Sequence, residues 1–319
     1  MSEKSTNKPF SNFQLIESKK ALPLNTGTLI FNSEKFVHLH ANRNIISFSS
    51  EGSDGESALN ISFDLFNNRA ISLLYCPYAG LSILKNTTEE ELIVFFKNIV
   101  QRLTDRGIKE IVVKQPPFFI GEMSNKYLDQ ILKSCGFKVQ STEINHHINL
   151  MQQNYLDSTH PMQKRKIKKC IQYALVMKQE SISTIPEIHS FITHCRNQTG
   201  LAINISQKNL LNAFQKLPDH YESFTIRNQQ NQILAATVIV KINEEVVYNY
   251  LPAFDRKFKA YSPLTFLTYE LVHKYKNEGY QHIDLGISSI DGSPQKSLIT
   301  FKARMGAIES NRLVYHIEV

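Results

Sequence analysis

The sequence predicts a mixed α/β fold of the α+β type, in which two units of similar design, residues 1–152 and 153–319, follow each other. Three observations support this prediction: both halves contain strand pairs, both contain helices with recognisable ends, and corresponding residues recur at a nearly constant distance. We therefore expect each unit to be a mixed, largely antiparallel sheet flanked by helices. The recurring pairs are Pro77 and Pro252, 175 residues apart, Gly107 and Gly279, 172 apart, and Gly136 and Gly306, 170 apart.

Each half opens on a pair of strands with alternating or β-branched composition. In the first half these are "ALNISFDLFNN" and "AISLLYCPYAG", joined at Asn67 and Asn68. In the second half, "QILAATVIVKI" and "VVYNYLPAF" flank Asn243. Asparagine adopts the left-handed conformation that tight hairpin turns require, so both pairs are predicted to be hairpins.

A helix with clear capping signals follows each hairpin. "TEEELIVFFKNIVQRLTDRG" has Thr88 as its N-cap and Gly107 beyond its end. "YSPLTFLTYELVHKYKNEG" has Ser262 before Pro263, which suits the first helical position, and Gly279 beyond its end. Polar caps, an early proline and a late glycine are the usual boundaries of a helix.

The remaining elements also occur in pairs. The short strands "IKEIVVK" and "YQHIDLG" lead to the helices "NKYLDQILKSCG" and "SLITFKARMG". Both halves then close on a strand, "EINHHINL" and "NRLVYHIEV". The boundary between the two units is predicted within "LMQQNYLDSTHP", residues 150–161.

Composition restricts the class of protein. The 319 residues are 42% hydrophobic, and 36 Lys and Arg against 29 Asp and Glu give a net charge of +7, which suits either an anionic partner or an ordinary charged surface. The four cysteines lack the spacing of a disulfide framework or a zinc site, so no metal is expected. "MSEKSTNKPF" lacks the apolar core of a signal peptide, and no run approaches the roughly 18 apolar residues of a membrane span. We expect a cytoplasmic protein.

The order of elements, with a helix between the fourth and fifth strands, resembles the fold of GNAT acyltransferases. Two copies in tandem resemble the Fem family of peptidoglycan aminoacyl transferases. The resemblance is carried by "PMQKRKIKKC", "YSPLTFLTYEL", "IDLGISS" and the dipeptide Phe301-Lys302, and it is stronger over residues 161–307 than over residues 40–150. It implies acyl transfer to an amine, with acyl-coenzyme A or aminoacyl-tRNA as the donor.

Lys302 is the candidate catalytic residue. In ordinary GNAT enzymes a tyrosine four residues before the closing glycine often acts as general acid, and here that position is Lys302, whereas the first half has Leu132. The resemblance implies that this lysine assists transfer or holds phosphate, next to Phe301 in the substrate site. A lysine ammonium suits an oxyanion, a leaving group or a phosphate. The alternative is that Lys302 lies on the polar face of an ordinary terminal helix.

Five further residues are candidates for substrate binding. The resemblance implies that the strand "VVYNYLPAF" receives the amide-bearing arm of the donor. The loop "ISSIDGSPQKS" follows the end of a strand, where α/β folds usually carry specificity. Alternatively, the strand is an ordinary aromatic strand and the loop contains only a turn and a helix start. The candidates are Tyr248 and Tyr250 in the strand, and Ser288, Asp291 and Gln295 in the loop.

Candidate contacts for the donor phosphates lie in "DRKFKAYSPL", where coenzyme-A-dependent GNAT enzymes usually carry a glycine-rich loop. This segment has no glycine, but Lys257, Lys259 and the helix start at Ser262 can bind an anion. The missing glycines favour aminoacyl-tRNA over coenzyme A. In residues 162–173, five cations occur within six positions, and the resemblance selects Arg165 as a phosphate or carboxylate contact. A solvated helix face is the alternative.

The sequence thus predicts a Fem-like acyltransferase that acts on a small-molecule amine acceptor, with a tRNA as a further candidate partner. An acyl-coenzyme-A-dependent N-acetyltransferase is the second interpretation. A non-catalytic RNA- or anion-binding protein is the third, and it predicts binding that weakens steeply with salt.

Overall fold

The computed structural model describes residues 14–18, 29–39, 43–51, 57–84, 87–200 and 202–319. The segment "MSEKSTNKPF", on which the expectation about a signal peptide depends, lies outside these ranges. Within them, no helix has both the length and the apolar character needed to cross a bilayer.

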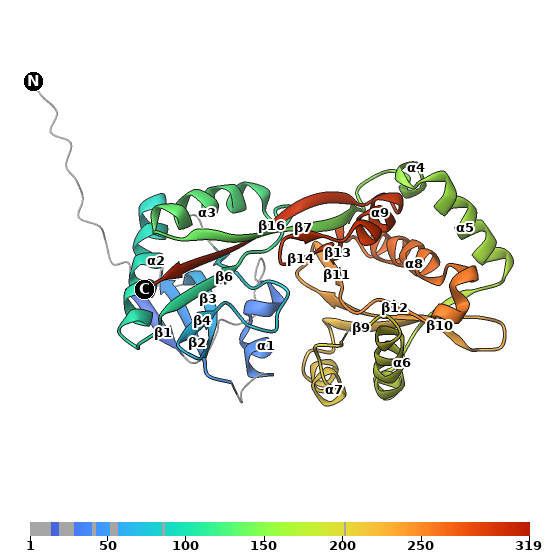
Figure 1. Cartoon of the computed structure of the whole chain (residues 1–319), viewed down its shortest axis with the longest axis horizontal. Helices are drawn as coiled ribbons and strands as arrows, with labels where there is room; N and C mark the ends of the chain where they lie inside the picture. The colour runs from blue at the N-terminus through green and yellow to red at the C-terminus, as the bar shows by residue number, and fades with distance from the viewer. Residues whose placement is uncertain (1–13, 19–28, 40–42, 52–56, 85–86, 201) are drawn as a thin grey trace, which may run out of the picture.

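One long sheet crosses the whole molecule (Figure 1). Its order is β1-β2-β3-β4-β6-β16-β7-β13-β11-β10-β9-β8, with β5 paired to β3 and β12 paired to β10, and β14 and β15 form a separate pair. The strands are β1 (Gln14–Ser18), β2 (Ile45–Glu51), β3 (Ser57–Phe66), β4 (Arg69–Ile71), β5 (Ser82–Ile83), β6 (Glu110–Lys114), β7 (Lys138–Asn149), β8 (Val176–Gln179), β9 (Tyr221–Arg227), β10 (Ile233–Lys241), β11 (Val246–Asn249), β12 (Ala253–Phe254), β13 (His282–Ile287), β14 (Ser289–Ile290), β15 (Ser293–Pro294) and β16 (Ile308–Glu318).

Helices flank both parts of this sheet (Figure 1). In the C-terminal part, α8 packs against β9 and β10 from one side, while α6 and α7 pack from the other. The α-helices are α1 (Glu34–His38), α2 (Glu89–Thr104), α3 (Glu122–Ser134), α4 (Tyr155–Ser158), α5 (Pro161–Gln172), α6 (Ile185–Asn197), α7 (Gln207–Lys216), α8 (Pro263–Asn277) and α9 (Lys296–Arg304); the 3₁₀ segments are η1 (Ile30–Asn32), η2 (Ile182–Thr184) and η3 (Arg256–Tyr261).

Local signals act as expected at most element ends. Asn67 and Asn68 both have positive φ, 49° and 59°, which is the conformation of a type I′ turn between β3 and β4. Thr88 and Glu91 form a reciprocal capping box at the start of α2. Gly107 and Gly279 end α2 and α8 with φ of 79° and 87°. The predicted fold class, a mixed and largely antiparallel sheet with flanking helices built twice, is confirmed.

The closing strands differ from the expectation that each half completes its own sheet. β7, the last strand of the first half, pairs with β13 of the second half. β16, the last strand of the second half, pairs with β6 of the first half. The two exchanged strands also pair with each other, from Lys138 opposite His316 to His147 opposite Ile308. The sheet is therefore continuous, although the chain passes from one half to the other in the loop after β7.

Among the described residues, three large hydrophobic cores and a small cluster around Val112 lie along this sheet. Phe95 and Phe96 of α2 lie in the core of the first half, which also contains Tyr315 from the exchanged β16. The core of the second half includes Tyr275 of α8 and Ile148 from the exchanged β7. A third core joins residues of the first half, around Phe31 and Tyr78, to α6, α7 and β10. Each half therefore buries apolar side chains that the other half supplies.

Candidate active site

The two parallel strand pairs mark equivalent places in the two halves. β11 pairs with β13 only as far as Tyr248 and Asp284, and β4 pairs with β6 only as far as Ile71 and Val112. Beyond these residues the paired strands separate. The candidate site lies where β11 and β13 part.

Lys302 reaches this place from α9. Its side chain is buried, with 7% of its surface exposed, and its Nζ donates to the carbonyl oxygens of Gly286 at 2.8 Å and Ile287 at 2.9 Å. Burial lowers the pKa of the Lys302 ammonium to about 8, and the Asp284 carboxylate opposes the shift. Lys302 therefore does not lie on a polar, solvent-facing side of α9. Leu132, its counterpart in the first half, is fully buried in the apolar core.

A second buried lysine occupies the first half. Lys114, at the end of β6, donates from Nζ to the carbonyl oxygens of Leu73 at 2.7 Å, Leu74 at 3.0 Å and Cys76 at 2.8 Å. Burial lowers the pKa of this ammonium to about 8 as well. An ammonium has three N–H donors. Lys114 therefore uses all of its donors on the chain that follows β4, whereas Lys302 uses two and has no third partner among the described residues.

Asp284 fixes the end of β13 beneath Lys302. Its side chain is fully buried and accepts hydrogen bonds from Tyr78 Oη at 3.1 Å, Asn145 Nδ2 at 2.8 Å and the Gly286 N–H at 2.8 Å. Burial raises the pKa of the Asp284 carboxyl, and these three donors and the Lys302 charge oppose the increase. A carboxylate with this set of donors is held in place, so Asp284 has a structural role at the end of β13.

The exchanged strand β7 holds the loop that follows β13. The Ser288 N–H donates to the Ile144 carbonyl at 2.6 Å, and Ser288 Oγ lies 3.0 Å from His146 Nδ1. Glu143 accepts from Ser289 Oγ at 2.5 Å and from the Gly292 N–H at 3.0 Å. The first half of the chain thus supplies the support for the candidate site of the second half.

The three predicted loop residues have different surroundings. Ser288 is fully buried against His146, so in this structure it does not face a substrate. Asp291 is exposed, with φ of 48°, in the turn between β14 and β15. Gln295 is half-buried at the N-cap of α9, and its Nε2 donates to the Ser293 carbonyl. Only the last two of the three predicted contacts are accessible.

Tyr248 and Tyr250 lie together beside the site. Their ring centroids are 5.8 Å apart, and Tyr248 is 6.3 Å from Tyr78. Gly286 has φ of 74°, and a Cβ atom placed there would lie 3.2 Å from the Tyr248 ring. The glycine therefore lets β13 turn close beneath this aromatic side chain.

Arg196 on α6 is a further candidate residue that was not predicted from the sequence. This half-buried guanidinium interacts electrostatically with Tyr248 and Tyr250, and burial lowers its pKa. Its Nε is buried and has no hydrogen-bond partner among the described residues. A buried donor without a partner is costly, so this residue is a candidate contact for an anionic substrate group. The sequence signal is a single arginine in the last turn of the amphipathic helix "IPEIHSFITHCRN".

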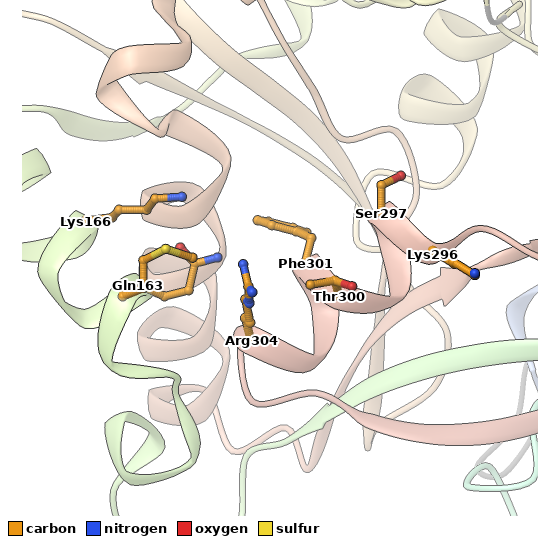
Figure 2. Close-up of a pocket in the computed structure, with 8 residues that line it drawn as sticks. Gln163, Lys166, Lys296, Ser297, Thr300, Phe301 and Arg304 are labelled. Carbon is orange, nitrogen blue, oxygen red and sulfur yellow. The ribbon is translucent and has the colours of Figure 1, made fainter.

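An open pocket of about 420 Å³ lies between α5 and α9. Figure 2 shows Gln163 and Lys166 extending from α5 toward Phe301 and Arg304 of α9, with Lys296 at the far end of α9. Three cations and no acidic residue line it, so it favours an anion. Phe301 lines this pocket. Arg165 is exposed on α5 and does not line the pocket, where Lys166 stands instead.

The predicted donor-binding segment borders the same pocket. Gln163, which lines the pocket, accepts from Thr265 Oγ1 in the first turn of α8 at 3.3 Å. Ser262 has φ of 51° and precedes α8, but its side chain makes no capping hydrogen bond. Lys257 forms an ion pair with Asp255 at 3.0 Å, and Lys259 is exposed. Lys259 and the Leu264 N–H at the start of α8 thus remain available to an anion.

The described ranges show how the side chains that can bind a metal and the cysteines are arranged. These residues contain no group of three or more His, Cys, Asp or Glu side chains that could hold a metal ion. Cys76, Cys135, Cys170 and Cys195 are all free thiols.

Comparison with known proteins identifies the fold. Residues 207–293 match the family described as the acetyltransferase (GNAT) domain, a segment that ends before α9 and Lys302. No curated protein sequence matches the chain. Among solved structures, FemX superposes with a TM-score of 0.70 at 12% identity, covering 94% of each chain. The fold is thus that of the GNAT superfamily.

The particular form of this fold is Fem-like. Two further structures share it at lower similarity. L-PGS from Bacillus licheniformis has a TM-score of 0.58 at 12% identity, covering 92% of this chain and 93% of that one. The C-terminal domain of a putative lysylphosphatidylglycerol synthetase from Agrobacterium fabrum has a TM-score of 0.58 at 11% identity, covering 89% and 86%.

Proposed function

We propose that this protein is an acyltransferase that transfers an acyl or aminoacyl group to an amine. Its active site lies where strands β11 and β13 separate. The observation that carries the proposal is the difference between the two buried lysines. Lys114 donates three hydrogen bonds to backbone carbonyl oxygens, whereas Lys302 donates two. The remaining N–H of Lys302 is available to a reacting group at the place where GNAT folds receive an acyl donor.

For this reaction the protein has to position the two substrates and stabilise the charge that develops. The acceptor nitrogen forms a bond to the donor carbonyl carbon, and the ester or thioester bond of the donor breaks. The amine loses one proton, and the leaving oxygen or sulfur gains one. An ammonium with a pKa of about 8 suits the leaving group, since it stabilises the developing negative charge there and can release a proton to it near neutral pH.

We propose that the donor carries phosphates and that these bind at the α5–α9 pocket and the start of α8. The cations Lys166, Lys296 and Arg304 support this proposal. Aminoacyl-tRNA is the leading candidate, because "DRKFKAYSPL" lacks the glycines that bring backbone close to a coenzyme pyrophosphate. Acyl-coenzyme A is the second candidate, because the Leu264 N–H at the start of α8 has no capping partner among the described residues. The half-buried guanidinium of Arg196 supports the further proposal that the acceptor carries an anionic group.

The test is transfer of a radiolabel. The full chain is incubated with a pool of small metabolites and either labelled acetyl-coenzyme A or a labelled aminoacyl-tRNA mixture. Mild base then hydrolyses the remaining ester or thioester but leaves an amide intact. Base-stable label from one donor supports the proposal and identifies that donor. Failure of both donors to give a base-stable product, at any enzyme concentration, contradicts acyl transfer. RNA binding that weakens steeply with salt would then indicate a binding protein.

A further inference from the structure

A second cavity, of about 210 Å³, lies between the two halves and away from Lys302. The first half contributes most of its wall, and the turn before β11 and the start of β13 supply the rest. Its apolar lining is formed mainly by Leu29, Leu81, Phe119, Ile120, Leu128 and Val246. An apolar cavity of about 150 Å³ admits benzene, so this one has room for a single ring with a short side chain.

Two neighbouring histidines lie at one side of this cavity, one of them in its wall. His282 lines it, and its ring lies 5.3 Å from that of His147 and 5.4 Å from that of Phe119. His147 stacks on Phe119 with a centroid distance of 4.0 Å and an interplanar angle of 12°. Both Nδ1 atoms are buried and lack a hydrogen-bond partner among the described residues. His147 is 6% exposed.

These imidazoles are held in the neutral form. Burial lowers the pKa of His147 to about 4, with a smaller effect from His282, and burial also lowers the pKa of His282. A neutral imidazole has one N–H and one lone pair. A buried ring nitrogen without a partner is unusual, and a ligand group with a hydrogen bond to offer would satisfy it.

The charge at this cavity is opposite to that of the α5–α9 pocket. Glu245 is its single charged lining residue, and no lysine or arginine lines it. The Glu245 carboxylate is exposed and accepts a hydrogen bond from Gln281 Nε2 at 2.9 Å. A carboxylate at the edge of this cavity, whose lining is partly polar, attracts a cation and repels a carboxylate or phosphate.

The cavity is separate from the candidate active site. His282 begins β13, and the Gly286 carbonyl that Lys302 contacts lies four residues further along. At about 3.3 Å per residue, the two places are about 13 Å apart. A single ring in the cavity therefore does not reach Lys302.

We propose that this cavity binds a small apolar amine, with its hydrocarbon part against Phe119, Leu128 and Val246 and its ammonium group at Glu245 and His282. Because both halves of the chain form the walls, the bound amine links them directly. Ligand binding to the folded state alone raises the melting temperature, so saturating amine also stabilises the protein against unfolding.

The test compares three fluorinated probes of similar shape, observed by fluorine NMR with the full chain. These are 4-fluorobenzylamine, which is a cation, 4-fluorobenzyl alcohol, which is neutral, and 4-fluorobenzoate, which is an anion. We expect the amine to bind saturably, at least fivefold tighter than the alcohol, and the benzoate to bind least. No donor or acyl acceptor is required, so the result is independent of the proposed transferase activity.

Two exposed neighbours provide a matched pair of variants. Glu245→Gln removes the charge at the cavity, whereas Glu244→Gln removes an equal charge from the adjacent residue, which does not line it. Glu245→Gln should reduce amine affinity to that of the alcohol, and Glu244→Gln should leave it unchanged. The proposal is overturned if the amine does not bind at about 10 mM, if the three probes bind equally, or if both variants lose the same affinity.

Discussion

Replacing Lys302 by Met should remove a pH dependence of folding stability that the buried ammonium creates. The pKa of Lys302 is lowered from 10.5 to about 8, so between these values the unfolded chain binds more protons than the folded chain. Stability therefore rises as the pH increases from 8 toward 10.5, and the full cost of burying the charge is present below pH 8. With these two pKa values, the wild-type protein should gain about 2 kcal/mol relative to Lys302→Met between pH 7 and pH 9.5.

The assay is guanidinium unfolding followed by circular dichroism at both pH values, with reductant present to protect the thiols. Cysteines and tyrosines with raised pKa values also change stability in this range, but they occur in both proteins and cancel in the difference. The contribution of Lys114 to the pH dependence of stability cancels for the same reason. A stability difference between wild type and Lys302→Met that is constant with pH would show that the ammonium is solvated with an ordinary pKa. The hydrogen bonds assigned to it would then be wrong.

Two further predictions follow from local geometry and charge. Gly286→Ala should destabilise the fold by about 2 kcal/mol, since φ is 74° and the new Cβ would lie 3.2 Å from Tyr248. Gly279→Ala has φ of 87° and nothing within 4 Å of the new Cβ, so it should lose only the stability that backbone strain costs, about 1 kcal/mol. Equal losses in guanidinium unfolding would show that the approach to Tyr248 is unimportant. Lys166→Ala should weaken pyrophosphate binding at low salt about fivefold, measured by calorimetry, whereas Arg165→Ala, outside the pocket, should change it less than twofold. A larger loss of pyrophosphate affinity in Arg165→Ala than in Lys166→Ala would show that Arg165 is the phosphate contact.

Much of the fold could be predicted because its signals are local. Asn67 and Asn68 can adopt positive φ, Thr88 caps a helix, and Gly107 and Gly279 end two helices, so element ends follow from single residues. The exchange of β7 and β16 could not be predicted in this way. A strand presents the same alternating pattern whether its neighbour belongs to its own half or to the other, so sequence periodicity does not choose the partner.

The site was predicted unevenly for a related reason. Lys302 emerged from comparing the two halves, because a charged residue stands where Leu132 is apolar. Ser288 was a reasonable loop candidate, but its burial depends on His146, which lies 142 residues earlier on the exchanged strand. Arg196 was missed because nothing local distinguishes it from an ordinary helix-terminal arginine. Its Nε, which has no partner among the described residues, becomes apparent only when α6 packs against β10 and β12.

The most direct test of the central claim is the rate of a single transfer turnover by Lys302→Met and Lys114→Met, using whichever donor gives a base-stable product. Both variants remove a buried ammonium with a pKa of about 8, so both change folding in a comparable way. Because only Lys302 retains an N–H for the reacting groups, Lys302→Met should lower the rate by roughly a hundredfold or more, as the loss of one oxyanion donor does. Lys114→Met, corrected for the folded fraction, should remain within about twofold of wild type. Near-wild-type turnover in Lys302→Met, or equal losses in both variants, would contradict the assignment of the chemistry to Lys302.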